Sequence, residues 1–190
     1  MKKNRSKRIW AIVGVFIVVL MLGISLSTSS HALMTTYYTL LSSTISSLRI
    51  VQLTDLHNSE FGEDNARLVS SVRAQSPDLI LLTGDLLNSD EQRTDIATDL
   101  IAKLCDIAPV YFSNGNHEIE YEERYGVDID ELYREEGAVV LEKEYQDITV
   151  KNQKIRLGGI YGYCLPGKYL ETGEADPEET AFLEEFQDTE

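Results

Sequence analysis

The middle of the chain reads Leu79-Ile80-Leu81-Leu82-Thr83-Gly84-Asp85, an apolar run that ends in a polar pair. Two further short apolar runs, at 50–54 and 110–112, also end at polar residues. All three are too continuously apolar for half-exposed strands, so we predict parallel strands that are buried on both faces. Apolar residues at helical spacing over 65–76 and 90–106 separate the runs. The sequence therefore predicts an α/β fold that repeats strand, helix, strand.

Three short polar islands follow these runs at nearly equal intervals. They are Asp55-Leu56-His57, Gly84-Asp85 and Gly115-Asn116-His117-Glu118. Loops at the carboxyl ends of neighbouring parallel strands converge on one crevice, so we expect the islands to meet there. Their carboxylates, amide oxygen and imidazoles suit Mn, Fe or Zn better than Ca or Mg alone. An aspartate that bridges two cations holds them about 3.5 to 4 Å apart, and Asp85, on the middle island, is placed to do so.

Each island also has a plain structural interpretation. Asp55 or Asp85 could cap a helix, Asn116 could sit in a turn, and a single histidine is more often structural than a ligand. The repetition of three islands at equivalent strand ends favours the metal site over these separate explanations.

The N-terminal residues indicate a membrane segment. Five basic residues and no acidic one lie in the first 32 residues, and the uncharged run 9–26 follows the basic cluster directly. Its 18 residues are nearer to a span of about 20 than to a signal-peptide core of about 7 to 15. We predict a cytoplasmic basic tail (1–8), a transmembrane anchor or signal segment (9–26) and a linker (27–34). Everything after the anchor would then lie outside the cytoplasm, or be secreted if cleavage occurs near Ala32.

The rest of the chain is strongly acidic. Beyond residue 32, 12 basic residues stand against 32 acidic ones, a formal net charge of -20. Such a domain lacks the basic stripe that binds nucleic acid, so we expect any phosphate to be held through metal. The β-forming residues of 35–45 favour an opening edge strand. We expect Cys105 and Cys164 to be small buried hydrophobic residues, although the sequence leaves a disulfide between them open.

The islands and their surroundings resemble the calcineurin-like metallophosphoesterases. Asp55-Leu56-His57, Gly84-Asp85-Leu86-Leu87-Asn88 and Gly115-Asn116-His117-Glu118 are similar to the first three motifs of that family. The contexts 51–58 and 77–85 are similar to its membrane-anchored bacterial branch. The resemblance covers residue 35 to the C-terminus and implies an αββα sandwich of two mixed sheets, incomplete at its C-terminal end.

The resemblance also implies roles for the island residues. Asp55 and His57 would bind one divalent metal ion, Asp85 would bridge two, and Asn116 would bind the second. His117 would face the phosphate and protonate or stabilise the leaving oxygen, while a hydroxide between the metals attacks a phosphodiester or phosphomonoester. Glu118 would act in a supporting shell.

The sequence departs from the family after the third motif. Members continue with another metal-binding histidine and a Gly-His-x-His segment, whereas the histidines here are His31, His57 and His117. We therefore expect 35–190 to be the N-terminal part of a metallophosphoesterase domain, inactive or nearly so as this chain. The alternative is a non-catalytic remnant that binds metal weakly or serves as an interaction module. An outward-facing anchored domain makes lipid-linked or cell-wall phosphodiesters reasonable substrates, and the oligomeric state stays open.

Overall fold

The chain divides into two compact units, Met1–Tyr38 and Thr39–Glu190. The computed structural model describes residues 13, 15–19, 21, 33–160, 182 and 185–187. In the first unit, the described residues between 13 and 21 are helical, with exposed side chains. The predicted span 9–26 lies largely outside the described residues, and none of the helices described is long and apolar enough to cross a membrane.

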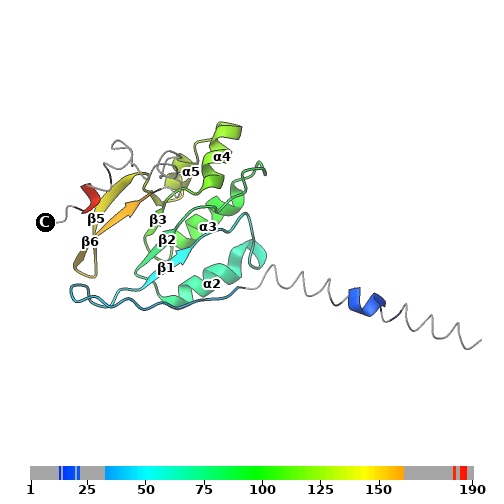
Figure 1. Cartoon of the computed structure of the whole chain (residues 1–190), viewed down its shortest axis with the longest axis horizontal. Helices are drawn as coiled ribbons and strands as arrows, with labels where there is room; N and C mark the ends of the chain where they lie inside the picture. The colour runs from blue at the N-terminus through cyan, green and yellow to red at the C-terminus, as the bar shows by residue number, and fades with distance from the viewer. Residues whose placement is uncertain are drawn as a thin grey trace, which may run out of the picture. The chain divides into compact units, whose positions relative to one another are not determined.

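A four-stranded parallel sheet is the framework of the second unit (Figure 1). Its strands, in spatial order, are β1 (Ile50–Leu53), β2 (Leu79–Leu82), β3 (Val110–Phe112) and β4 (Val139–Val140). The connections carry η1 (Glu63–Asn65), α2 (Ala66–Gln75), α3 (Asp95–Cys105), α4 (Asn116–Tyr125) and α5 (Ile129–Glu135). The predicted strands and the first two helices are confirmed, with the second helix starting five residues later than expected. A parallel pair needs such a crossover between its strands, which explains the alternation.

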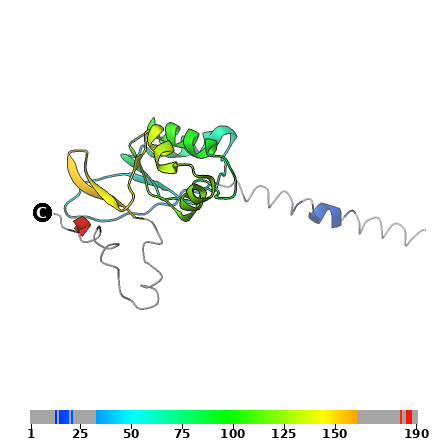
Figure 2. The ribbon, with the colours of Figure 1, turned by 90° about the horizontal axis from the view of Figure 1, so that it is seen from above.

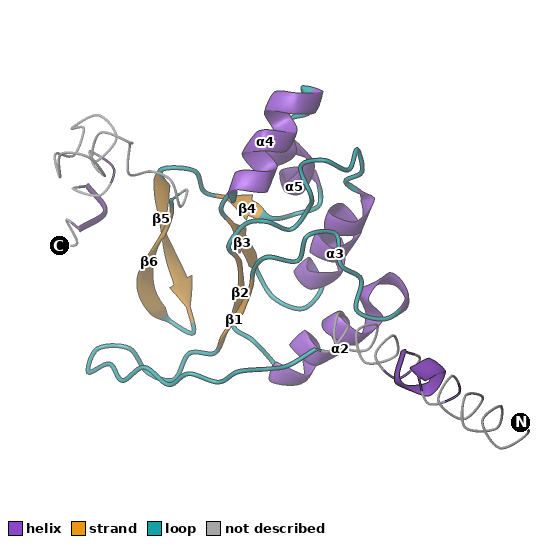
Figure 3. Ribbon diagram, turned by 45° about the vertical axis from the view of Figure 1, so that its right-hand side comes forward, coloured by secondary structure: helices purple, strands orange, loops and turns teal. Residues whose placement is uncertain are grey.

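The core lies between one face of the sheet and the helices. Alternate residues of neighbouring strands share this face, and Ile80, Leu82, Val110 and Phe112 are each at most 1 % exposed. Figure 3 shows α2, α3 and α5 on this side of the sheet. Phe112 meets the buried Tyr133 of α5 edge to face at 4.7 Å between ring centroids. Burial of such large side chains supplies the main stabilisation of the unit.

The expectation of strands buried on both faces holds for the middle of the sheet only. β2 is nearly buried throughout, whereas Ile50 of β1 is 47 % exposed and Gln52 is exposed too. The reason is position, because β1 is an edge strand among the described residues and pairs with β2 alone. On the face away from the helices, Leu81 and Tyr111 are half-buried.

A separate antiparallel hairpin follows the parallel sheet. Its strands are β5 (Glu144–Val150) and β6 (Gln153–Gly159), and Figure 2 shows the two as a long ribbon apart from the helical layer. The sequence pattern over 154–161 predicts a strand, and its residues up to Gly159 lie in β6. Each described sheet is of one kind, parallel or antiparallel, instead of the two mixed sheets expected. Helical crossovers keep the first sheet parallel, while a two-residue turn makes the second antiparallel.

Two local expectations are wrong or only partly met. Residues 35–45 form no strand, and Leu40 and Leu41 within them are 93 % and 95 % exposed. The β-propensity of this segment has no effect by itself, because it acts only where a neighbouring strand offers pairing. Cys105 is half-buried and not fully buried, and burial raises the pKa of its free thiol. Cys164 lies outside the described residues, and so does most of the acidic segment 178–186, for which the sequence pattern predicts a helix.

Candidate metal centre

The loops that leave β1 and β2 run side by side past the ends of their strands. Three backbone hydrogen bonds join them: Asp55 N–H to Gly84 O at 3.1 Å, His57 N–H to Asp85 O at 3.0 Å and Asn58 N–H to Leu86 O at 2.9 Å. The pairing of β1 with β2 thus continues into the polar islands. Asp55, His57 and Asp85 are brought together by backbone bonding that does not require a ligand.

Several island residues have a backbone conformation that is uncommon outside glycine. The φ angles are 54° at Asp55, 48° at His57, 56° at Asn58 and 55° at Asp85. Asp, Asn and His tolerate this left-handed region better than other residues, and each such residue costs on the order of 1–3 kcal/mol where the surroundings impose it. Strain of this kind concentrates at functional sites, and here it turns the side chains toward one edge of the sheet.

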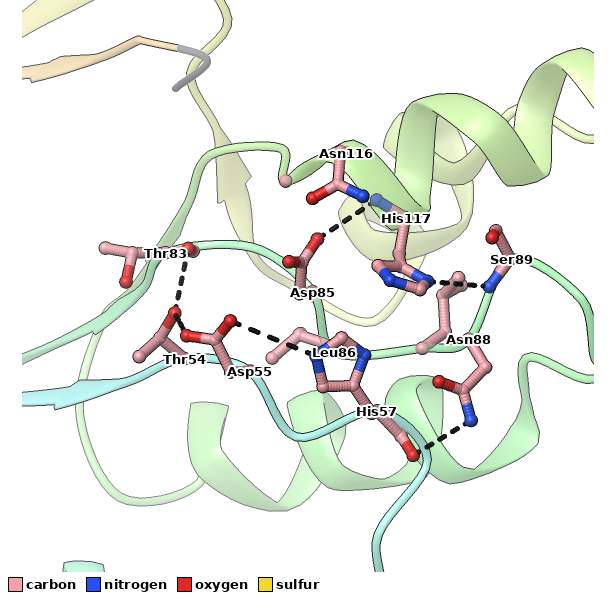
Figure 4. Close-up of polar contacts among 12 residues, drawn as sticks. Thr54, Asp55, His57, Thr83, Asp85, Leu86, Asn88, Ser89, Asn116 and His117 are labelled. Carbon is pink, nitrogen blue, oxygen red and sulfur yellow. Dashed lines mark hydrogen bonds and ion pairs between the residues drawn. The ribbon is translucent and has the colours of Figure 1, made fainter. Parts of the chain in front are cut away.

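The side chains of the three islands converge in Figure 4. Ligand atoms of His57, Asp85 and His117 all lie within 4.8 Å of one another, and the three residues are half-buried. The two imidazole rings meet edge to face at 4.6 Å. Oδ1 of Asp55 is 3.9 Å from Nε2 of His57, while its other oxygen accepts a hydrogen bond from the Thr54 hydroxyl at 2.7 Å. This donor set of carboxylate oxygens and imidazole nitrogens fits a divalent transition metal.

Two glycines allow the second and third islands to pack closely against each other. A Cβ added at Gly115 would lie 2.2 Å from Oδ1 of Asp85, and one at Gly84, where φ is 80°, would lie 2.3 Å from the Gly115 nitrogen. A side chain at Gly115 would displace Asp85, and one at Gly84 would displace the backbone at Gly115. The same oxygen accepts the backbone N–H of His117 at 3.0 Å, which holds the carboxylate beside the start of α4.

Glu118 holds the backbone of the site and is not one of the side chains that converge in it. It is 0 % exposed, and its oxygens accept the N–H groups of Asp85 (2.8 Å), Leu86 (2.8 Å) and Gly115 (3.0 Å). The bond from Gly115 is half of a capping box at the N-terminus of α4, since glycine has no side chain to return it. Burial raises the pKa of Glu118, and the backbone donors oppose that shift. The supporting role expected for this residue agrees with these contacts.

His117 and Asn116, the first two residues of α4, are each oriented by a neighbour. The backbone N–H of Ser89 donates to Nδ1 of His117 at 3.0 Å (Figure 4). The Asn116 amide donates to Oε1 of Glu120 at 3.4 Å, and Oε2 of Glu120 accepts the Ser89 hydroxyl at 2.8 Å. Hydrogen bonds from Ser89 and then Asn116 lower the pKa of Glu120.

Further side-chain hydrogen bonds join the loops that follow β1 and β2. Glu91 accepts the side-chain amides of Asn58 at 3.0 Å and Asn88 at 3.2 Å. The Asn88 amide also donates to the carbonyl oxygen of His57 at 3.2 Å. Asn88, the last residue of the second motif, therefore holds the backbone of the first motif at His57.

The structure places all five predicted site residues at one edge of the sheet, whereas several supporting residues were not foreseen. Ser89 acts through its backbone N–H, for which the side-chain pattern carries no signal. Glu120 stands four residues after Asn116, a spacing that would have indicated the contact had a helix been expected there. Thr54 directly precedes Asp55, and its hydroxyl was a signal that could have been used.

Comparison with known proteins bears on the same segment. The sequence profile described as calcineurin-like phosphoesterase matches residues 48–188, most of the second unit. An uncharacterized metallophosphoesterase of Campylobacter jejuni is 36% identical over 76 residues, which are 37% of this chain and 20% of the relative. The chain thus spans about a fifth of the length of that curated relative.

Proposed function

The chain belongs to the calcineurin-like phosphoesterases, and from that membership we propose that it hydrolyses phosphoester bonds with divalent cations. The observation that carries the proposal is the meeting of His57, Asp85 and His117 within 4.8 Å. These residues come from three loops at the carboxyl edge of one parallel sheet, the edge where such folds bind ligands.

We assign the cation ligands by position. Asp55 and His57 would hold one cation, Asp85 would hold this cation and a second, and Asn116 would hold the second through its amide oxygen. A bound cation pair of this kind lowers the pKa of water toward neutrality and neutralises charge on phosphate oxygens. Mn, Fe and Zn all suit the mixture of imidazole and oxygen donors.

His117 would hold the proton for the leaving oxygen. Its Nδ1 accepts the Ser89 N–H, so Nδ1 carries no proton and the neutral ring carries its proton on Nε2. A protonated Nε2 donates a hydrogen bond and does not bind metal. This arrangement supports a general acid at His117 over a fifth cation ligand.

The substrate class follows from charge and position. A net charge of -20 beyond residue 32 disfavours polyanions such as nucleic acid, so phosphate recognition would depend on the cations. The basic cluster and the uncharged run 9–26 support a membrane-tethered, extracytoplasmic protein. We therefore propose a lipid-linked or cell-wall phosphodiester, or a small phosphoester, as substrate.

A second candidate function is metal binding with little turnover. In the part of the chain that the structure describes, the assignment gives one cation three protein donors and the other two. A cation with so few donors is held loosely, so we propose that hydrolysis at this site is slow. Turnover and metal affinity must therefore be measured separately.

The test uses the whole chain in detergent, with Mn²⁺ titrated by calorimetry and hydrolysis followed on a chromogenic phosphodiester. We expect Asp85→Ala to abolish Mn²⁺ binding, because Asp85 would contact both cations, and His31→Ala to leave binding unchanged. We expect His117→Ala to lower any measurable turnover by about 10² to 10⁴-fold, the usual contribution of a general acid, with a smaller effect on metal content. Unchanged Mn²⁺ binding in Asp85→Ala would refute the bridging assignment.

A further inference from the structure

Ser89 is fixed to α4 at three of its atoms. The residue is 4 % exposed, its N–H donates to Nδ1 of His117 at 3.0 Å and its hydroxyl donates to Glu120 at 2.8 Å. Its carbonyl oxygen accepts a hydrogen bond from Arg124 at 2.8 Å. The loop after β2 therefore has little freedom to move relative to the start of α4.

The three partners of Ser89 lie on one face of the helix. His117, Glu120 and Arg124 are spaced by three and four residues, the separations that bring helical side chains next to one another. Asn116 stands four residues before Glu120 and donates its amide to the second oxygen of the same carboxylate at 3.4 Å. Glu120 is the residue that contacts both Ser89 and Asn116.

Each of these contacts sets the chemistry of another side chain. A backbone N–H can only donate, so the bond from Ser89 leaves Nδ1 of His117 without a proton. A carboxylate can only accept, so Glu120 requires the amide nitrogen of Asn116 on its side and turns the amide oxygen away. The oxygen is the atom that a hard cation binds.

We propose that Glu120 is a positioning residue of this site, which holds the Ser89 donor against His117 and orients the Asn116 oxygen for a cation. The proposal rests on the proposed function for the roles of His117 and Asn116. Glu120 is exposed and lies on the surface of α4, so its removal leaves the core of the domain intact. Partners that orient metal ligands contribute typically 10–100-fold to metal affinity or activity.

The first readout is the bond between Ser89 and His117 in the whole chain without metal. Nuclear magnetic resonance detects it through the scalar coupling across the hydrogen bond and through slow exchange of the Ser89 amide. The chain has three histidines, so His31→Ala and His57→Ala assign the His117 ring by elimination. We expect Glu120→Ala to remove the coupling and to speed exchange of this amide by roughly tenfold, because the hydroxyl tether is lost.

The second readout is Mn²⁺ affinity, measured by calorimetry. We expect Glu120→Ala to weaken binding by about tenfold, since the Asn116 amide is then free to rotate. Ser89→Ala removes the tether but not the contact to Asn116, so it should change amide exchange and leave Mn²⁺ affinity within about twofold. Glu120→Gln keeps one acceptor oxygen, so it should restore either the slow exchange of the Ser89 amide or the native Mn²⁺ affinity, but not both.

Glu123→Ala is the matched control, because Glu123 is an exposed glutamate of the same helix. We expect it to change neither readout. The proposal is overturned if Glu120→Ala keeps both the coupling and the affinity of the native chain, or if Glu123→Ala produces the same losses. Both readouts are taken without substrate, so an absence of phosphoester hydrolysis alongside the expected losses would favour metal binding with little turnover over hydrolysis and would leave the positioning role intact.

Discussion

Gly115 shows how a missing side chain shapes the candidate metal centre. The place of its Cβ is filled by the Asp85 carboxylate and by the Asp85 nitrogen, at 2.2 Å and 2.6 Å from where that atom would stand. The backbone there has a φ of -98°, which any residue adopts, so the demand for glycine is purely steric. A substitution at Gly115 therefore tests the packing of the site without adding backbone strain.

We predict that Gly115→Ala displaces the Asp85 carboxylate and lowers Mn²⁺ affinity by about tenfold or more. Overpacking should also cost about 1–3 kcal/mol in the free energy of unfolding. Gly126→Ala is the control, since nothing lies within 4 Å of its added Cβ although its φ is 66°. We expect Gly126→Ala to destabilise the chain by about 1–2 kcal/mol and to keep its metal affinity. Calorimetry and urea unfolding separate the two effects, and equal metal affinities in both variants would contradict the prediction.

At this scale the sequence was informative for the polar side chains that stand at the ends of the predicted strands. Asp55, Asp85 and His117 stand at strand ends, so their convergence followed from the topology of a parallel sheet. Ser89 could not be found in this way, because its contribution is a backbone N–H whose direction depends on the folded loop. Glu120 was not identified, because the sequence contains many acidic residues and most of them are solvated.

Among the elements, Asp78 makes one of the contacts that join the two sheets. Oδ2 of Asp78, just before β2, accepts the Lys151 ammonium of the β5–β6 turn at 2.7 Å and the backbone N–H of Arg49 at 2.7 Å. These donors, Lys151 first, hold the pKa of the Asp78 carboxyl below its ordinary value. Because Lys151 is largely exposed, the pair contributes no more than about 1 kcal/mol.

A lowered carboxyl pKa in the folded chain gives stability that is present above the ordinary value of about 3.9 and is lost as the pH falls below it. We predict that Asp78→Asn is less stable than the native chain at neutral pH, and that the difference shrinks as the pH drops through this window. Urea unfolding at a series of pH values measures the difference. Asp99→Asn, on the exposed face of α3, should show no such convergence, and a gap for Asp78→Asn that is independent of pH would argue against the ion pair.

The elements differ in how well their sequences predict them. β2 is continuously apolar and was foreseen, whereas β5 mixes Glu144, Gln146 and Asp147 with apolar residues and was missed. None of its residues is fully buried, and its half-buried residues, Tyr145, Ile148 and Val150, lie on both faces, so the sequence has no apolar alternation that would predict a strand. The reverse error occurred at 35–45, where β-forming residues have no strand beside them.

For the whole molecule, the N-terminal sequence makes a prediction about location. Five basic residues followed by the uncharged run 9–26 should hold the chain in a membrane with its acidic domain outside the cytoplasm. A reporter that is active only outside the cytoplasm, fused after Glu190, should be active and should sediment with membranes. Replacing the five basic residues by glutamine should reduce this activity, because the orientation depends on them. An inactive reporter that is recovered in the soluble cytoplasmic fraction would contradict the prediction.

The register of the parallel sheet has a consequence for how the chain folds. Ile50 pairs with Leu79 and Ile80 with Val110, so β1 meets β2, and β2 meets β3, only after a crossover of 29 or 30 residues has closed. Such non-local contacts form slowly, because the entropy of closing each crossover is lost before the pairing compensates for it. The three loops of the metal centre meet only when both closures are complete. A cation pair that draws on all three loops would therefore bind the native chain alone, and it would slow unfolding while leaving the rate of folding nearly unchanged.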